Sequence, residues 1–147
     1  MYKITVKEFV EAHIDQIDNN DWYDVFSDAY HIIEQTRFAF DINEFIDLMT
    51  DIDPNFLSDT YVERKKLIDY YIEENYTSEL HTFQADENYG GKYRGLIFYP
   101  RIISNLHHYL GFTFKDINKF IDESPLYGKR VTVNGRKAID VRDLIWM

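Results

Sequence analysis

The 147-residue sequence has no cysteine, only three prolines and six glycines, and no long apolar run. Without cysteine the chain has no disulfide framework, no thiolate zinc site and no cysteine nucleophile. No apolar stretch approaches the roughly 18 residues of a membrane-spanning helix, and the N-terminal segment MYKITVKEF lacks the pattern of a secretory signal. We therefore expect a soluble cytoplasmic protein that has no membrane partner.

Motifs that carry catalysis or bind metals are also missing. None of the five histidines stands four residues from another, as a helical zinc site would require; they are His13, His31, His81, His107 and His108. The glycine pair Gly90-Gly91 is not followed by the lysine-serine pair of a phosphate-binding loop. We therefore expect no catalytic residue, no metal site, no cofactor and no enzymatic activity. A metal-dependent nuclease built on aspartate and glutamate stays open as an alternative.

Acidic residues outnumber basic ones by 26 to 16, which gives a net charge of −10. The chain is nevertheless 45% hydrophobic and 17% aromatic, a composition typical of a folded protein. Residues 1–99 carry a net charge of −13, from 8 basic and 21 acidic residues, and residues 100–147 carry +3, from 8 and 5. This asymmetry indicates two surfaces with different partners, or two surfaces that attract each other across a homodimer.

Helical spacing of apolar residues dominates the first half of the chain. It predicts helices over about 6–18, 21–37, 41–51 and 60–75. Capping residues precede them, and the predicted caps are Thr5 with Glu8, Asn20 or Asp21, Asp41 with Glu44, and Thr60 with Glu63. Asp53-Pro54 ends the third helix. The periodicity fades over 76–95, which contains NYGGKYRG and is predicted to be a linker or mobile loop.

Carboxylates recur every three or four residues along the first three predicted helices. They are Glu8, Glu11, Asp15, Asp18, Asp21, Asp24, Asp28, Asp41, Glu44, Asp47 and Asp51. Neighbours at this spacing lie about 5–6 Å apart and repel by a few tenths of a kcal/mol per pair. One interpretation is an ordinary solvent face with acids favoured at helix N-termini. The other is a row of negative charge whose pitch approaches that of nucleic-acid phosphates, able to occupy a basic groove.

In this overall composition the chain resembles the small acidic phage-encoded anti-CRISPR and antirestriction proteins, many of which act as nucleic-acid mimics. The resemblance implies a non-enzymatic inhibitor in the host cytosol. Its partner would be a host nucleic-acid-binding protein or nuclease complex, such as a Cas effector or a restriction enzyme. A further alternative is a structural or assembly protein whose 12 tyrosines and 11 phenylalanines form an oligomer interface.

The last third of the chain has a different pattern. Pro100 precedes a predicted helix that Gly111 ends, and its apolar face is Ile102, Ile103, Leu106 and Tyr109. Thr113 with Asp116 caps a second predicted helix over about 114–123, with Phe114, Ile117, Phe120 and Ile121 inward; Ser124-Pro125 stops it. RVTV and RKAI flank Asn134-Gly135, which predicts a hairpin, and Asp140 caps a terminal turn. We therefore predict a mainly α fold with a C-terminal hairpin (α+β). We expect two regions, an acidic helical region over 1–95 and a helix-turn-helix plus hairpin module over 96–147.

The stretch 106–146 resembles the excisionase and MerR-type winged helix-turn-helix, in which a leucine-glycine turn, a recognition helix, a short wing and a closing helix follow in order. The resemblance implies that duplex DNA is contacted by Lys115, Asn118 and Lys119 in the major groove, and by Arg130, Asn134, Arg136 and Lys137 on the wing. The alternative function is therefore a DNA-binding regulator or recombination accessory protein. Asp116, Asp122 and Glu123 oppose phosphate contact, so a role of this module in protein contact also stays open.

Overall fold

The computed structural model describes residues 4–36, 42–86, 88–103 and 111–145 and is mainly helical, with one three-stranded antiparallel sheet, so the predicted α+β class is confirmed. The chain forms two compact units: residues 1–68 with 107–112, called here the acidic unit, and residues 69–106 with 113–147, called the sheet unit. The division falls inside helix α6, Tyr61–Ala85, rather than near residue 95. Among the described residues, no helix is long and apolar enough to cross a membrane.

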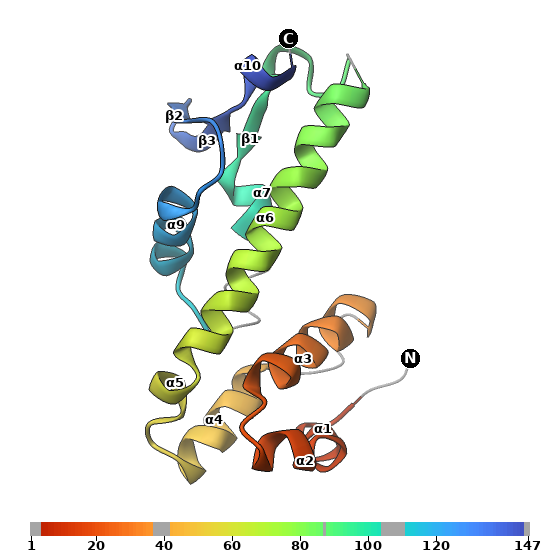
Figure 1. Cartoon of the computed structure of the whole chain (residues 1–147), viewed down its shortest axis with the longest axis vertical. Coiled ribbons are helices and arrows are strands. Elements are labelled where there is room, and N and C mark those ends of the chain that lie inside the picture. Colours follow the sequence, from red (N-terminus) through yellow and green to blue (C-terminus); the bar gives the residue numbers. More distant parts are fainter. Residues whose placement is uncertain (1–3, 37–41, 87, 104–110, 146–147) are drawn as a thin grey trace. The chain divides into compact units, whose positions relative to one another are not determined.

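The acidic unit is built from helices alone in its described part (Figure 1). They are α1 (Val6–Ala12), α2 (Ile14–Asp18), α3 (Trp22–Thr36), α4 (Ile42–Ile52), α5 (Phe56–Asp59) and the first turns of α6. The Thr5 side chain accepts a hydrogen bond from the Glu8 amide, as the predicted cap requires. The Asp53-Pro54 break is also confirmed, because the Asp53 carboxylate accepts from the Asn55 amide and α4 has ended at Ile52.

The helix predicted over 6–18 is interrupted at His13, which separates α1 from α2. The ring of His13 stacks on Phe9, with the centroids 4.1 Å apart. One ring nitrogen, Nδ1, lies 2.9 Å from the Phe9 carbonyl oxygen, and the other, Nε2, lies 3.0 Å from Oδ2 of Asp28. Both of these partner atoms are hydrogen-bond acceptors. These contacts tie α1 to α3, and apolar spacing along the sequence gives no sign of them.

Phenylalanine rings form the centre of the acidic unit. The ring of Phe45 in α4 lies 5.4 Å from Phe9, 6.1 Å from Phe26 and 6.2 Å from Phe56, in edge-to-face arrangements. All four rings are almost completely buried. Such rings contribute both apolar burial and a specific geometry, which fixes how α1, α3, α4 and α5 pack.

The α5–α6 corner is held by a buried arginine. Arg64 is 3% exposed, donates from Nη2 to the Leu57 carbonyl oxygen at 2.7 Å, and places its guanidinium 4.6 Å from the centroid of Phe112. Its Nε donates to the Thr60 hydroxyl at 3.1 Å, and that hydroxyl donates to the Phe56 carbonyl oxygen. Thr60 therefore does not form the predicted cap with Glu63, because its side chain is turned into this buried network.

The sheet unit combines the larger, C-terminal part of α6 with a small sheet in the strand order β1-β3-β2 (Figure 1). Its elements are η1 (Gly91–Tyr93), β1 (Leu96–Phe98), α7 (Tyr99–Ile103), α9 (Phe114–Glu123), β2 (Lys129–Val133), β3 (Arg136–Asp140) and α10 (Arg142–Ile145). Ile139 of the central strand pairs with Ile97 on one side and Arg130 on the other. The strand β1 is absent from the sequence-based prediction.

The linker predicted over 76–95 is wrong in its first half, because α6 continues to Ala85. Ile72, Tyr76 and Phe83 keep one side of the helix buried, although polar residues between them weaken the apolar pattern. The hydroxyl of Tyr76 also donates to the carbonyl oxygen of Tyr127 at 2.6 Å. The second half of the segment folds into the short helix η1 before β1 begins.

The predictions for α9 and the hairpin are confirmed. Both hydrogen bonds of the Thr113–Asp116 capping box are present, and α9 spans the predicted residues. The hairpin turns at Asn134 and Gly135, whose φ angles of 52° and 77° suit the asparagine-glycine pair of a type I′ turn. Phe114 differs from the prediction, since it is 51% exposed. It occupies the first position of the helix, outside the packing that buries the apolar residues of the later turns.

Candidate binding surfaces

Almost all of the acidic residues singled out in the sequence lie on the surface of the acidic unit. Ten of the eleven are in the described residues and all ten are exposed; Asp41 lies outside the described residues. Summed over its residues, the acidic unit has 6 basic and 15 acidic residues, a net charge of −9, whereas the sheet unit has 10 and 11, a net charge of −1. The two units differ in net charge by 8, less than the difference of 16 between residues 1–99 and 100–147, because the acidic residues that follow Ile68 belong to the sheet unit.

Two of the acidic rows meet at one groove between α1 and α4, with a volume of about 640 Å³. Its floor is apolar and its rim is acidic. The lining residues are Val6, Lys7, Val10, Glu11, Glu44, Asp47, Leu48 and Asp51. The sequence predicts the carboxylates on each helix, but not that Glu11 of α1 joins those of α4 around an apolar floor, since the packing angle of two helices cannot be read from their separate patterns.

Two other acidic residues of this unit are in contact with neighbouring side chains. Asp28 accepts from His13, so its charge also holds α3 to the junction of α1 and α2. Asp59 has a pKa above its usual range, mainly because its carboxyl group hydrogen-bonds with that of Asp53; desolvation and the negative charge of Asp53 act in the same direction. Neither Asp53 nor Asp59 belongs to the predicted rows.

The residues that the winged-helix resemblance assigns to DNA contact lie on α9 and the β2–β3 hairpin. Five are exposed and Asn118 is partly exposed. The exposed residues are Lys115, Lys119, Asn134, Arg136 and Lys137. The guanidinium of Arg136 lies 4.6 Å from the ring centroid of Phe98 in β1, and Nδ2 of Asn134 lies 3.5 Å from the Tyr93 hydroxyl.

Arg130, the remaining residue of that set, is used inside the sheet unit. Its Nη1 donates to the carbonyl oxygens of Leu126 and Gly128, both at 2.9 Å. Its Nη2 donates to those of Ile121 at 3.2 Å and Ser124 at 3.1 Å. The guanidinium thus joins the end of α9 to the start of the hairpin. This differs from the phosphate contact that the resemblance implies, because the same N–H groups are already engaged.

A carboxylate also links α9 to the hairpin. Asp122 accepts from the Tyr99 hydroxyl at 3.0 Å and lies 4.0 Å from Nζ of Lys137. Burial raises the pKa of Tyr99, and the hydrogen bond to Asp122 adds to this, so its hydroxyl stays a donor at neutral pH. Asp122 therefore neutralises part of the positive charge on the hairpin.

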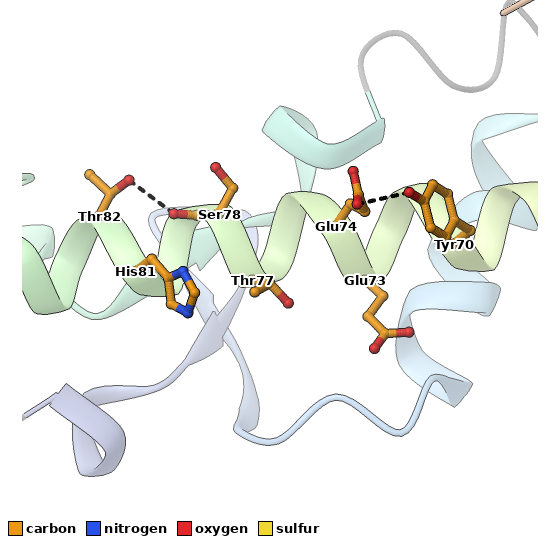
Figure 2. Close-up of a pocket in the computed structure, with 7 residues that line it drawn as sticks. All are labelled: Tyr70, Glu73, Glu74, Thr77, Ser78, His81 and Thr82. Atoms are coloured by element: carbon orange, nitrogen blue, oxygen red, sulfur yellow. Dashed lines mark hydrogen bonds between the residues drawn. The ribbon is translucent and has the colours of Figure 1, made fainter.

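A third surface is a shallow depression of about 620 Å³ along the exposed side of α6 in the sheet unit (Figure 2). It is lined by Tyr70, Glu73, Glu74, Thr77, Ser78, His81 and Thr82, all from this helix. The Tyr70 hydroxyl donates to Glu74 at 2.9 Å, and the Thr82 hydroxyl donates to the Ser78 carbonyl oxygen at 2.9 Å. Within the described ranges, no cluster of three or more histidine, aspartate or glutamate side chains is arranged to hold a metal ion.

Comparison with known proteins gives no relative for the chain: no family model, no curated protein and no solved structure matches it. Its function is therefore inferred from the residues of its own surfaces.

Proposed function

We propose that the protein is a non-enzymatic inhibitor of a nucleic-acid-binding protein and that its acidic unit occupies the basic nucleic-acid groove of that partner. The observation that carries this proposal is the net charge of −9 on the acidic unit, with ten exposed carboxylates along α1 to α4. The compositional resemblance to anti-CRISPR and antirestriction proteins makes a Cas effector or a restriction enzyme the partner to test first.

The arrangement of these carboxylates has a cost to the fold. Asp47 and Asp51, for example, are one helical turn apart on α4 and repel each other in the free protein. Binding to a cationic groove replaces this repulsion by attraction and also raises the rate of association. A surface selected for stability alone would intersperse lysine or arginine along the same turns, whereas α4 contains no basic residue.

An electrophoretic competition assay tests the proposal. A labelled duplex is bound to purified Cas effector complexes and restriction enzymes, and the full chain is added in increasing amounts. We expect the duplex to be released from its effector, with weaker competition at higher salt because the contact is electrostatic. If every effector keeps its duplex at large excess of the chain, the mimicry proposal fails.

A second candidate function is duplex DNA binding by the sheet unit. It is favoured by the exposed cations that α9 and the hairpin present, among them Lys115, Lys119, Arg136 and Lys137. The chain would then be a winged-helix regulator or recombination accessory, with the acidic unit recruiting a partner protein. Asp122 beside Lys137 and the internal use of Arg130 count against strong phosphate contact.

Mobility-shift titration with the double variant Arg136→Ala, Lys137→Ala tests this second candidate. We expect the intact chain to bind duplex at low salt and the variant to lose most of that affinity, with a smaller salt slope. The matched control is Lys65→Ala with Lys66→Ala, which removes the same charge from the acidic unit. Absence of duplex binding by the intact chain at low salt would eliminate the candidate.

A further inference from the structure

We infer that the groove between α1 and α4 binds a basic amphipathic helix of the partner protein. One apolar side chain of that helix would lie on Val6, Val10 and Leu48, with lysine or arginine side chains along the acidic rim. This inference rests on the proposed function and deepens it, because it names a part of the partner that the acidic unit contacts.

The floor of the groove is apolar and only partly uncovered, since Val6 is buried, Val10 is partly exposed and Leu48 is exposed. The side of α4 that faces the core is formed by Ile42, Phe45, Ile46 and Met49, all of them buried. Leu48 lies off that side and is 39% exposed, and Ile52, one turn further along, is 71% exposed. Neighbouring exposed aliphatic side chains beside a groove are typical of a protein contact surface. Val6 and Val10, one turn apart on α1, complete the floor.

The charge of the rim determines which kind of partner segment the groove can bind. Four of the described lining residues are acidic, namely Glu11, Glu44, Asp47 and Asp51, and Lys7 is basic, so the lining carries a net charge of −3. A nucleic acid or an anionic lipid surface would be repelled by this charge. A purely apolar segment would desolvate the carboxylates without giving them a partner.

A helix with one apolar face and basic flanks satisfies both parts of the groove. It covers the apolar floor, and its cations meet the carboxylates at the edge, where complementary charge favours both association and orientation. A groove between two helices that presents an apolar floor suits the helix-in-groove mode of recognition. The occupant is therefore a cationic segment of a protein and not a phosphate-like ligand, which the acidic rim would repel.

The probe is a fluorescein-labelled peptide of about five helical turns with leucine along one face and lysine elsewhere. The control probe has the same composition in an order that spreads the leucines around the helix. Fluorescence anisotropy with the full chain at low salt measures both. We expect the amphipathic probe to bind at least about tenfold more tightly than the control probe, a difference that electrostatics alone does not produce.

Paired variants separate the groove from the rest of the acidic surface. Leu48→Gln should weaken binding of the amphipathic probe about tenfold, whereas Leu57→Gln, at a residue of nearly equal exposure (38%) outside the groove, should change it less than about twofold. The double variant Asp47→Asn, Asp51→Asn should weaken it about tenfold. The double variant Asp15→Asn, Asp18→Asn removes the same charge from α2 and serves as its control. Circular dichroism verifies that each variant folds.

The outcomes distinguish this inference from the proposed function. If the two aspartate double variants weaken binding of the amphipathic probe equally, or if the two probes bind with equal affinity, the groove is not the binding site. The inhibitor proposal is then unaffected. Selective binding at the groove by a chain that releases no duplex from any effector supports this inference and counts against the inhibitor proposal.

Discussion

The two units of this protein use charge in opposite ways. In the acidic unit most of the charge points outward, as ten exposed carboxylates on α1 to α4. In the sheet unit much of the charge holds the fold together: Arg130 joins α9 to the hairpin, and Asp122 contacts both Tyr99 and Lys137. Net charge alone therefore does not identify a binding surface, because charged groups that are engaged inside the fold are not available to a partner.

One aspartate from each unit illustrates the contrast. Asp140 of the sheet unit accepts from Nη2 of Arg142 at 2.6 Å and from its Nε at 3.0 Å, and these hydrogen bonds lower the pKa of Asp140. Asp59 of the acidic unit has a raised pKa, chiefly from its hydrogen bond with Asp53. The fold thus favours ionisation of Asp140 and disfavours ionisation of Asp59.

The largest expected effect comes from removing the central ring of the acidic unit. Phe45→Ala deletes a fully buried side chain that contacts three other phenylalanines, and should lower the free energy of unfolding by about 3–5 kcal/mol. Urea unfolding followed by NMR resonances from each unit measures this. Phe114→Ala in the half-exposed position of α9 should cost less than about 1 kcal/mol. Similar losses in the two variants would show that the phenylalanine cluster is not the core of the acidic unit.

The next effect tests whether Arg130 is structural. Arg130→Ala leaves four carbonyl oxygens at the end of α9 and the start of the hairpin without this donor, and should destabilise the sheet unit by about 2–4 kcal/mol. Arg136→Ala, an exposed cation on the same hairpin, should change stability by less than about 1 kcal/mol. The same urea titration measures both. If both variants change the stability of the sheet unit equally little, Arg130 is not a structural residue.

Acid should affect the two units in opposite directions. The raised pKa of Asp59 means that protonation stabilises the fold, so this contribution is present below the unfolded pKa of about 4 and is lost as pH rises through the folded value. The lowered pKa of Asp140 gives a contribution that is present above about pH 4 and is lost as pH falls through its folded value. On acidification, protonation of Asp59 should thus favour the acidic unit, whereas protonation of Asp140 below about pH 4 should weaken the sheet unit.

The urea midpoint of each unit, measured above and below about pH 4, tests these two opposite effects of acid. Asp140→Asn should remove part of the acid sensitivity of the sheet unit, and Asp59→Asn should remove part of the gain in the acidic unit. A sheet unit whose acid sensitivity is the same with and without Asp140→Asn would contradict the role of the pair with Arg142.

The smallest expected effect is that of salt. Screening weakens repulsion among the carboxylates of the acidic unit, so added sodium chloride should stabilise this unit by up to about 1 kcal/mol. The sheet unit, with a net charge of −1, should respond less. Equal responses of the two units, measured by the same resonances, would remove this distinction between them.

Local signals account for the parts of the fold that the sequence predicts well. The Thr113–Asp116 cap, the Ser124-Pro125 stop and the Asn134-Gly135 turn each act within a few residues, and α9 and the hairpin follow from them. The interruption at His13 coincides with a contact to Asp28 of another helix, and apolar periodicity alone predicts a continuous helix there. The strand β1 is three residues long and fully buried, so it shows no alternation that would mark it as a strand.

The candidate surfaces were predictable to a similar extent. Exposure of the acidic rows follows from helical spacing, and ten of those residues are indeed exposed. The apolar floor below Glu11 and Asp47 depends on how α1 packs against α4, and that packing is not a property of either helix alone. The internal role of Arg130 likewise depends on carbonyl groups at the end of α9 that only the folded sheet unit brings within reach.

The most direct test of the central claim compares the two units in one competition titration. Asn replaces Asp15, Asp18, Asp47 and Asp51 in a variant of the acidic unit; in a matched variant of the sheet unit, Gln replaces Glu73, Glu74 and Glu123, and Asn replaces Asp143. Each variant loses four exposed negative charges. Release of labelled duplex from a responsive effector is then measured. We predict that the first variant loses competition by at least about tenfold while the second competes like the intact chain; equal loss in both variants would contradict the claim that the acidic unit is the binding surface.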